Sequence, residues 1–347
     1  MFMPRAGLEL LQPYSVTEAD WTIRLDANER PSDLPPVVKA RVMERLGVLP
    51  FNRYPEIGAQ SLKAVIAAEF GLSGAQVLIG NGSSEILEAL CFAFGGAGSS
   101  IVYPSPSFSM YGIYAKLADS RPVPVALNAD YTLDADKMLA AAKQAAAGVI
   151  LLCNPNNPTG TVMPPAQIEY IAANTRSLVV VDEAYHEFYG QTAVNLLGKY
   201  PNLAIARTFS KAYGLAAARV GYLLAGEAVA GTIGKVLLPY SVNALTLITA
   251  ETVFGMRQEF AGSLAENSRE RERLTTALRA VDGIYVYPSQ TNFLLIKSEQ
   301  ASDLVKRLSR RGIGVRDFSA APGLAGCIRL GIGTPAENNA VLEVVAG

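Results

Sequence analysis

The stretch that decides the fold reads GVILLCNPNNPTG at residues 148–160 and is followed by LVVVDEAY at 178–185. In both segments a short run that is apolar at every position ends in Asn or Asp. Strands of a parallel sheet are buried on both faces and show this continuous apolar pattern. We therefore expect strands here and in three segments of the same design: QVLIGNGSSE at 76–85, SIVYPSPSFSMY at 100–111 and LAIARTFSKAYG at 203–214.

Helix-like stretches lie between these apolar runs. SSEILEALCFAF at 83–94 has an apolar face, and DADKMLAAAKQAA at 134–146 is rich in helix formers. Strands that alternate with helices are typical of a doubly wound α/β domain, in which ligands bind beyond the carboxyl ends of the strands. The polar residues at those ends should therefore meet at one site: Asn81, Ser83, Asn154, Asn157, Asp182, Tyr185, Ser210 and Lys211.

The character of the sequence changes after about residue 235. A long polar helix is predicted within 259–280, and strand-like segments such as YVYPSQTNFLLIK at 285–297 follow it. This pattern predicts a large domain over 31–235 and a smaller α+β domain over 236–347. The Pro-broken residues 1–30 are predicted to form an arm that packs with the small domain.

The bulk composition excludes several classes of protein. The 347 residues are 18% charged and 50% hydrophobic, and their formal net charge is -1. A nucleic-acid binder would show a basic stripe, and no long run of like charge occurs here. The longest apolar stretches are interrupted by Gly, Pro or charge, so we expect no membrane span. The N-terminal residues lack the apolar core of a signal peptide.

Cysteine and histidine usage narrows the classes further. Cys91, Cys153 and Cys327 are widely spaced and odd in number, which argues against a disulfide framework or a zinc ribbon and favours a reducing cytoplasm. His186 is the one histidine, so no histidine cluster can bind a metal, and we expect no metal site. His186 could be a base, but a single histidine more often packs or faces solvent.

Lys211 follows a strand-like run in the segment TFSKAYGL. An ordinary lysine has a pKa of about 10.4, so its amine must be desolvated or lie near another cation before it can form a Schiff base. Arg219, further along the same segment, could supply that cation or bind a cofactor phosphate through its planar fork. A surface lysine that precedes a helix remains the alternative.

Asp182 closes the apolar run LVVVD. A lone buried carboxylate is costly and needs a cationic partner, and the protonated nitrogen of a pyridine ring would be a suitable one. The alternative is a helix N-cap, a place that Asp favours. Glu183, the next residue, could equally belong to a salt bridge.

Two further segments carry polar groups that suit a phosphorylated aromatic cofactor. Asn157 belongs to the second of two Asn-Pro steps in NPNNPTG and could hold a phenolic ring oxygen, or the segment could be a plain turn. Gly82, Ser83 and Ser84 open a predicted helix, whose N-terminus could bind a phosphate or could merely be capped by serine. The patterns of dinucleotide and NTP sites are absent.

Three motifs occur in one order and spacing: NPNNPTG at 154–160, VVVDEAY at 179–185 and TFSKAYGLAAARVGY at 208–222. Together they resemble the aspartate-aminotransferase superfamily of fold-type I pyridoxal-phosphate enzymes, from about residue 20 to the C-terminus. The resemblance implies a mostly parallel central sheet flanked by helices, with a smaller α+β C-terminal domain. It also implies pyridoxal 5'-phosphate as the cofactor and a homodimer.

Further segments are similar to the histidinol-phosphate aminotransferase family within that superfamily. They are LQPYSV at 11–16, LDANERP at 25–31, NRYPE at 52–56, PSFSMYG at 106–112, and GVRDF at 314–318 followed by CIRLGIGT. This resemblance implies amino transfer between L-histidinol phosphate and 2-oxoglutarate in histidine biosynthesis.

The resemblance also implies roles at the cofactor. Lys211 would be the Schiff-base lysine and the proton shuttle, and Asp182 would pair with the pyridine nitrogen. Asn157 and Tyr185 would hold the ring hydroxyl oxygen, and Phe108 would stack on the ring. The cofactor phosphate would be surrounded by Ser83, Ser84, Thr208, Ser210, Arg219 and, from the neighbouring subunit, Tyr54.

Four residues match positions that the family uses for substrates. Arg329 resembles the arginine that grips the glutamate carboxylate, for which its bidentate geometry is suited. Tyr14, Asn28 and Arg316 would surround the amino substrate and its phosphate. Tyr14 could instead only anchor the arm, and Arg316 could pair with an acid such as Asp317.

Other classes of protein remain as alternatives. A threonine-phosphate decarboxylase or an aminotransferase for aromatic or other amino acids would have the same fold. A ligand-binding regulator of this fold would usually carry an added DNA-binding domain, and no such segment is recognised before residue 20. A hydrolase with Ser210 as nucleophile would need the pattern G-x-S-x-G, which does not occur around it.

Overall fold

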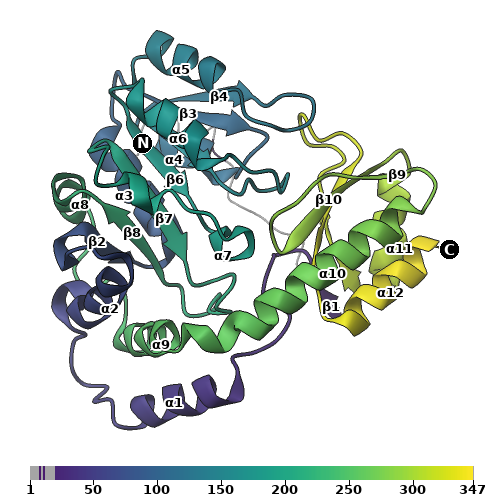
Figure 1. The fold of residues 1–347 in the computed structure, drawn as a ribbon, viewed down its shortest axis with the longest axis horizontal. Coiled ribbons are helices and arrows are strands. Elements are labelled where there is room, and N and C mark those ends of the chain that lie inside the picture. The colour runs from purple at the N-terminus through teal and green to yellow at the C-terminus, as the bar shows by residue number, and fades with distance from the viewer. Residues whose placement is uncertain (1–7, 9–10, 12–19, 347) are drawn as a thin grey trace, which may run out of the picture.

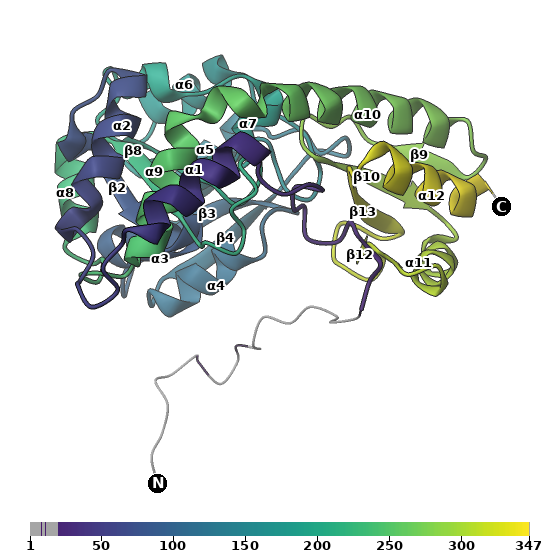
Figure 2. The same cartoon turned by 90° about the horizontal axis from the view of Figure 1, so that it is seen from below.

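The structure, a computed structural model, describes residues 8, 11 and 20–346. This part of the chain forms a large sheet with helices on both faces and a small sheet beside it, joined by one long helix (Figures 1 and 2). No helix among the described residues combines the length and the apolar character needed to cross a bilayer. The predicted substrate residue Tyr14 lies outside the described residues.

The large sheet has seven strands. In spatial order they are β2 (Val77–Gly80), β8 (Gly221–Ala225), β7 (Leu203–Thr208), β6 (Leu178–Asp182), β5 (Ala147–Cys153), β3 (Ser100–Ser105) and β4 (Arg121–Ala126). β8 is antiparallel to both neighbours, and every pair from β7 to β4 is parallel. The predicted α/β fold with a mostly parallel sheet is thereby confirmed, and β6 and β7 are buried throughout, as their continuous apolar runs indicate.

Helices cover the two faces of this sheet and enclose two separate cores. One core contains α3 (Gly82–Phe94), α4 (Met110–Leu117) and α8 (Glu227–Gly234). The other contains α1 (Pro36–Gly47), α2 (Gln60–Phe70), α5 (Ala135–Gln144), α6 (Pro165–Ala173) and α9 (Ala244–Gly255). Shorter helical segments are Ile57–Ala59, Gly74–Gln76, α7 (His186–Tyr189), Val194–Leu196 and Arg257–Phe260. The helices predicted within 83–94 and 134–146 correspond to α3 and α5.

β4 was not among the predicted strands. Its sequence RPVPVA contains Pro122 and Pro124, and proline cannot donate a hydrogen bond to a neighbouring strand. β4 lies at the edge of the sheet and pairs with β3 alone. The N–H groups of Arg121 and Leu127 donate to the backbone of β3 or of the residue just before it, so residues at the intervening even-numbered positions point their N–H groups away from β3. Pro122 and Pro124 occupy such positions, and their missing donors therefore fall on the open edge, where there is no strand to pair with.

The small sheet is antiparallel, in the order β12 (Arg316–Asp317), β13 (Cys327–Gly331), β10 (Phe293–Ser298) and β9 (Ile284–Val286). It shares a core with α10 (Ala261–Arg279), α11 (Ala301–Arg310) and α12 (Pro335–Ala346). Beside it, β1 (Ile23–Arg24) pairs in parallel with β11 (Ile313–Gly314), and Leu25 enters the same core. The chain before residue 30 therefore packs partly with the small sheet.

The packing around residue 236 differs from the predicted division at 235/236. Val242, most of the inward side chains of α9 and Phe260 belong to a core of the large sheet. The apolar side chains of the small-sheet core begin again only at Leu274, within α10. The residues from Val242 to Phe260, which were assigned to the small domain, thus pack on the large sheet, because the face of α9 has apolar neighbours in α1 and α2.

Candidate active site

A cavity of about 310 Å³ lies at the carboxyl ends of β5, β6 and β7, where it also meets the small sheet. Open sheets place ligand sites at this edge. Tyr54 does not line it, and neither do Asn81 and Asn154, whose side chains were expected at this edge; the Asn154 side chain bonds to the backbone of Met163 instead. The other predicted site residues that the structure describes all line it: Asn28, Ser83, Ser84, Phe108, Asn157, Asp182, Tyr185, Thr208, Ser210, Lys211, Arg219, Arg316 and Arg329. Segments more than 300 residues apart in the sequence therefore meet in one cavity, which contains both the amine of Lys211 and the carboxylate of Asp182.

Lys211 is held in a buried position just beyond β7. Its Nζ donates a hydrogen bond of 2.8 Å to the backbone oxygen of Ala27. Burial and, to a smaller extent, the positive charges of Arg329 and Arg219 together lower the pKa of Lys211 to about 8, and Glu29 opposes this. The amine is thus much easier to deprotonate than that of a surface lysine. Sequence reasoning named desolvation and Arg219 as possible causes and missed the larger effect of the Arg329 charge.

Asp182 ends β6 with its side chain enclosed. Its Oδ2 accepts a hydrogen bond of 2.9 Å from the Tyr111 hydroxyl, and its Oδ1 accepts one of 3.2 Å from the backbone N–H of Ala184. Burial raises the pKa of Asp182 to about 6, although these two hydrogen bonds oppose the rise. α7 begins only at His186, so Asp182 does not cap a helix. A buried carboxylate with so few donors is suited to a cationic ligand atom.

One end of the cavity has groups suited to an anion. α3 begins at Gly82, whose φ of +78° and proximity to Arg219 leave no room for a side chain: a Cβ there would lie 2.7 Å from the guanidinium. The Arg219 Nη1 donates to Ser210 Oγ at 3.3 Å. A helix N-terminus, a guanidinium and the hydroxyls of Ser83 and Ser84 thus face the same end, as a phosphate requires.

Tyr185 and Asn157 lie between the amine and the small sheet. The Tyr185 hydroxyl accepts a hydrogen bond of 3.0 Å from Asn28 Nδ2, and burial raises the pKa of Tyr185 to about 12. Asn157 Oδ1 accepts a hydrogen bond of 2.6 Å from Arg329 Nη1. Asn28, predicted to contact the substrate, therefore also fixes Tyr185, a contact that the sequence did not reveal.

These protein groups have the chemistry needed to bind the functional groups of pyridoxal phosphate. The cavity offers an amine of lowered pKa for the aldehyde, a buried acid for the ring nitrogen, and an amide and a phenol for the ring oxygen. Ser83, Ser84 and Arg219 supply donors for the phosphate. The residues present fit this cofactor.

Arginines and aromatic rings form the side of the cavity that faces the small sheet. The Arg329 guanidinium lies 5.4 Å from the centre of the Phe293 ring and 5.7 Å from that of Phe318, and Arg316 lies 6.0 Å from Phe318. A planar guanidinium can stack on a ring and still bind a carboxylate or a phosphate through its fork. The Arg329 guanidinium donates to Asn157 Oδ1 and, at 2.5 Å, to the backbone oxygen of Asp26. Arg24, in the two-residue strand β1, and Asp26, just after it, also line the cavity and were missed by the sequence reasoning, since so short a strand leaves no pattern in the sequence.

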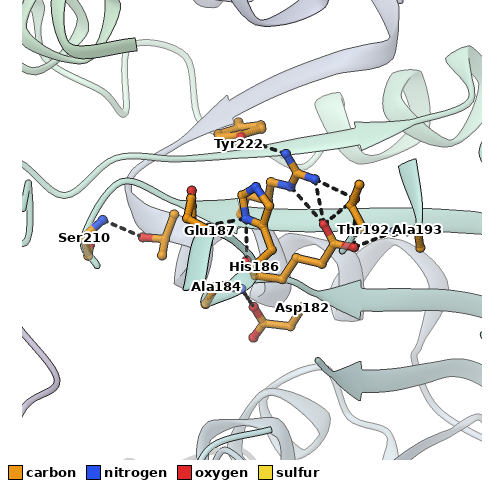
Figure 3. Close-up of polar contacts among 11 residues, drawn as sticks. Asp182, Ala184, His186, Glu187, Thr192, Ala193, Ser210 and Tyr222 are labelled. Carbon is orange, nitrogen blue, oxygen red and sulfur yellow. Dashed lines mark hydrogen bonds and ion pairs between the residues drawn. The ribbon is translucent and has the colours of Figure 1, made fainter. Parts of the chain in front are cut away.

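A buried ion pair joins Arg207 of β7 to Glu183, the residue that follows β6. Figure 3 shows its polar neighbours Thr192, Ala193 and Tyr222. Arg207 Nη2 donates to Glu183 Oε2 at 2.7 Å and to Thr192 Oγ1 at 2.7 Å, and the side chains of Arg207 and Glu183 are each only 1% exposed. Glu183 Oε1 also accepts the backbone N–H of Ala193 at 2.8 Å. His186 packs beside this group, with Nδ1 3.1 Å from Glu187, so its packing interpretation holds.

We expect Arg207→Met to lower the free energy of unfolding by about 3–5 kcal/mol, because it leaves the Glu183 carboxylate buried without its cation. The measurement is urea denaturation of the variant against the unaltered protein. The matched control is the double variant Arg207→Met/Glu183→Met, which removes both charges and should be clearly more stable than Arg207→Met alone. Equal losses in the two variants would contradict this explanation.

Comparison with known proteins assigns the chain to a class of enzyme. Residues 21–345 match the family described as aminotransferase class I and II, so the chain belongs to that family. Within it, the chain is 38% identical to histidinol-phosphate aminotransferase of Thermoanaerobacter pseudethanolicus, over 98% of this chain and 96% of the relative. It is 40% identical to the histidinol-phosphate aminotransferase of Thermococcus gammatolerans, over 96% and 94%. The resemblance to the histidinol-phosphate aminotransferases is thereby confirmed.

The fold comparison agrees. Histidinol-phosphate aminotransferase from Sinorhizobium meliloti, whose structure was solved in complex with pyridoxal-5'-phosphate, superposes with a TM-score of 0.85. The two chains are 27% identical, and the superposition covers 94% of this chain and 90% of the other. The large sheet, the small sheet and their relative placement are thus those of the fold-type I enzymes.

Proposed function

We propose that this chain is a pyridoxal-phosphate-dependent transaminase that converts L-histidinol phosphate and 2-oxoglutarate into imidazole acetol phosphate and L-glutamate, a step of histidine biosynthesis. The observation that carries the proposal is the single cavity in which the Lys211 amine, the Asp182 carboxylate and several arginines face one space. The substrate named for the near full-length relatives supports the same reaction.

Each group in the cavity has a task in this proposal. Pyridoxal phosphate, when bound, holds the amino group covalently and takes up the electron pair released at the substrate Cα. Lys211 takes the proton from Cα and returns it to the cofactor's C4′ carbon, work for which a pKa of about 8 is suited. Asp182 keeps the proton on the ring nitrogen. Tyr185, held by Asn28, orients the ring oxygen together with Asn157.

The cavity must accept two substrates whose charges lie in different places. Histidinol phosphate carries a phosphate and no α-carboxylate, whereas glutamate carries two carboxylates and no phosphate. Arg329 binds the glutamate carboxylate in this proposal, exchanging its contact with Asn157 for the substrate, and Arg316 binds the phosphate of histidinol phosphate. Arg24 adds positive charge on the same side.

A substrate panel tests the proposal. Steady-state assays with the holoenzyme compare histidinol phosphate, aromatic amino acids and threonine phosphate, each with 2-oxoglutarate. We expect the largest kcat/KM for histidinol phosphate. Carbon dioxide release from threonine phosphate, or a larger kcat/KM for an aromatic amino acid, would replace the proposed substrate while leaving the cofactor assignment intact.

Arg316→Ala should raise the KM for histidinol phosphate by about ten-fold or more and the KM for glutamate much less, because only the first substrate would lose a charge-assisted contact to its phosphate. Steady-state kinetics with each amino donor check this. Arg311→Ala, which alters an exposed arginine nearby, is the matched control and should change neither KM. Equal losses for the two donors would remove the phosphate role of Arg316.

The proposal includes a homodimer in which Tyr54 reaches the cofactor phosphate of the neighbouring subunit. Tyr54 does not line the cavity of its own chain, and it is 81% exposed while stacking on Tyr240 at 4.7 Å. Val48, Phe51 and Ile57 on the same segment are more than two-thirds exposed. An apolar group of this size on one segment is typical of a protein interface.

Mixing two variants should reveal this shared site. Tyr54→Phe is expected to weaken pyridoxal-phosphate binding by about ten-fold through the loss of one hydrogen bond to the phosphate. In a mixed dimer of Tyr54→Phe and Lys211→Ala, the Tyr54→Phe subunit keeps Lys211 and receives Tyr54 from its partner, so one site per dimer should bind the cofactor with unaltered affinity. If the mixture binds pyridoxal phosphate only with the weakened affinity, Tyr54 does not contribute to the neighbouring subunit's site, which would contradict the proposal.

In this proposal the cellular location is inferred from the state of the cysteines. Cys91, Cys153 and Cys327 are free thiols and all are buried. Burial raises the pKa of Cys91 and of Cys153 to about 12, which keeps both thiols protonated and unreactive. Reduced thiols suit the cytoplasm, where we place the enzyme together with its small-molecule substrates.

A further inference from the structure

Tyr111 lies behind the cavity, in the first turn of α4, and carries none of the roles assigned above. Its side chain is fully buried. Its hydroxyl donates a hydrogen bond of 2.9 Å to Asp182 Oδ2, although Tyr111 itself does not line the cavity. It therefore acts on the site only through Asp182.

The position of the Tyr111 ring is fixed by two aromatic contacts. Phe108 meets it edge-on, with ring centres 5.5 Å apart and planes at 88°, and Tyr103 packs at 6.1 Å and 65°. Phe108 lines the cavity where the cofactor ring is expected. One tyrosine thus links the predicted stacking ring to the predicted partner of the ring nitrogen.

The two hydrogen bonds to Asp182 fix its orientation. Tyr111 occupies Oδ2 and the backbone N–H of Ala184 occupies Oδ1. An ionised carboxylate has about four lone-pair sites, so acceptor capacity remains toward the cavity. Cys153, the nearby thiol, donates to the Pro155 oxygen at 3.4 Å instead. Within the described residues, the Tyr111 hydroxyl is the one side-chain donor recorded on Asp182.

Whether the carboxyl of Asp182 is ionised depends on this donor. Burial raises the pKa of Asp182, and the Tyr111 hydrogen bond is the largest influence that lowers it again. A hydrogen bond to the charged form of an acid favours that form. Without the hydroxyl, the carboxylate would bind a proton more strongly and would compete for the one on the ring nitrogen.

We propose that Tyr111 is a positioning residue that keeps Asp182 ionised and aimed at the ring nitrogen of the bound cofactor, so that the nitrogen retains its proton. This inference rests on the proposed function, because it requires a pyridine ring in the cavity. It concerns a residue that touches neither substrate nor cofactor.

Tyr111→Phe tests the inference, since it removes the hydroxyl and keeps the ring. The holoenzyme is loaded with pyridoxal phosphate labelled with ¹⁵N in the ring, and the ¹⁵N chemical shift is read without substrate. We expect the shift to move toward that of an unprotonated pyridine, and kcat to fall by about ten-fold or more with KM changed by less than about two-fold. Tyr103→Phe removes a hydroxyl from the adjacent ring and is the matched control, with no expected change in the shift.

A double-mutant cycle separates positioning from packing. In an Asp182→Asn background, Tyr111→Phe should change kcat by less than about two-fold, because the carboxylate it serves is gone. If Tyr111→Phe does not fold, Tyr111→His, which keeps a polar ring, takes its place in the same measurements. An unchanged ¹⁵N shift in the substituted holoenzyme, or an equal effect of Tyr103→Phe, would overturn the inference.

The outcomes also distinguish this inference from the proposed function. The ¹⁵N shift needs bound cofactor and no turnover. A protein that binds pyridoxal phosphate and shows the expected shift, but does not transaminate histidinol phosphate, would refute the substrate assignment and leave the role of Tyr111 standing. Failure to bind the cofactor at all would refute both.

Discussion

Replacing Lys211 with alanine is expected to lower kcat for histidinol phosphate by at least about 10⁴-fold, because the variant loses the base that moves the Cα proton. The amine is buried, its pKa is lowered to about 8, and its Nζ is held at 2.8 Å from the Ala27 oxygen. No other lysine lines the cavity, so no described neighbour can take over. Single-turnover kinetics with the reconstituted variant measure the loss.

The control for this variant is Lys235→Ala, which removes an exposed lysine after α8 and should leave kcat unchanged. The absorption spectrum provides a second readout. Borohydride should fix the cofactor to the unaltered protein at Lys211 and should fix none to Lys211→Ala. Near-normal turnover in the alanine variant would rule out the mechanism.

Asp182→Asn is expected to have two opposite effects. It should lower kcat by about 10³-fold, because the neutral amide cannot hold a proton on the ring nitrogen. It should also stabilise the cofactor-free protein at neutral pH by about 1–3 kcal/mol, because burial raises the pKa of Asp182 to about 6 and an ionised carboxylate there is costly. Activity and apoprotein stability would thus move in opposite directions.

The pH dependence of the stability gain checks its origin. The carboxyl of Asp182 ionises near pH 4 in the unfolded chain and near pH 6 in the folded one. Between these values the folded state binds more protons, so the free energy of unfolding falls as pH rises. The advantage of Asp182→Asn should therefore be absent at pH 4, grow through pH 6 and stay constant above it. An advantage that is the same at pH 4 and pH 7 would exclude this cause.

The sequence was sufficient to predict the central part of the fold. Strands buried on both faces leave continuous apolar runs, and the polar residues that end those runs lie together because parallel strands share one edge. For that reason Asn157, Asp182 and Lys211 could be assigned to one site before the structure was known. β4 was not predicted because its prolines are tolerated only in an edge strand, and whether a strand lies at the edge depends on the order of the strands in space.

The hydrogen bonds that fix the predicted site residues could not be predicted. The contact of Tyr111 with Asp182 joins residues 71 positions apart, and that of Asn28 with Tyr185 joins residues 157 positions apart. Neither tyrosine nor asparagine leaves a periodic signal that would mark such a partner. Arg24 and Asp26 likewise reach the cavity only because β1 pairs with β11, a parallel contact between distant parts of the chain.

The short connection from Leu25 to Asn28 limits where the chain can be opened by circular permutation or can accept an insertion. Leu25 is anchored among the side chains of the small sheet, Ala27 receives the hydrogen bond from Lys211, and Asn28 donates to Tyr185. A circular permutant opened after Asn28 would retain both sheets and still separate the reactive lysine from its acceptor. New termini or inserted sequence are better placed in exposed loops far from this connection.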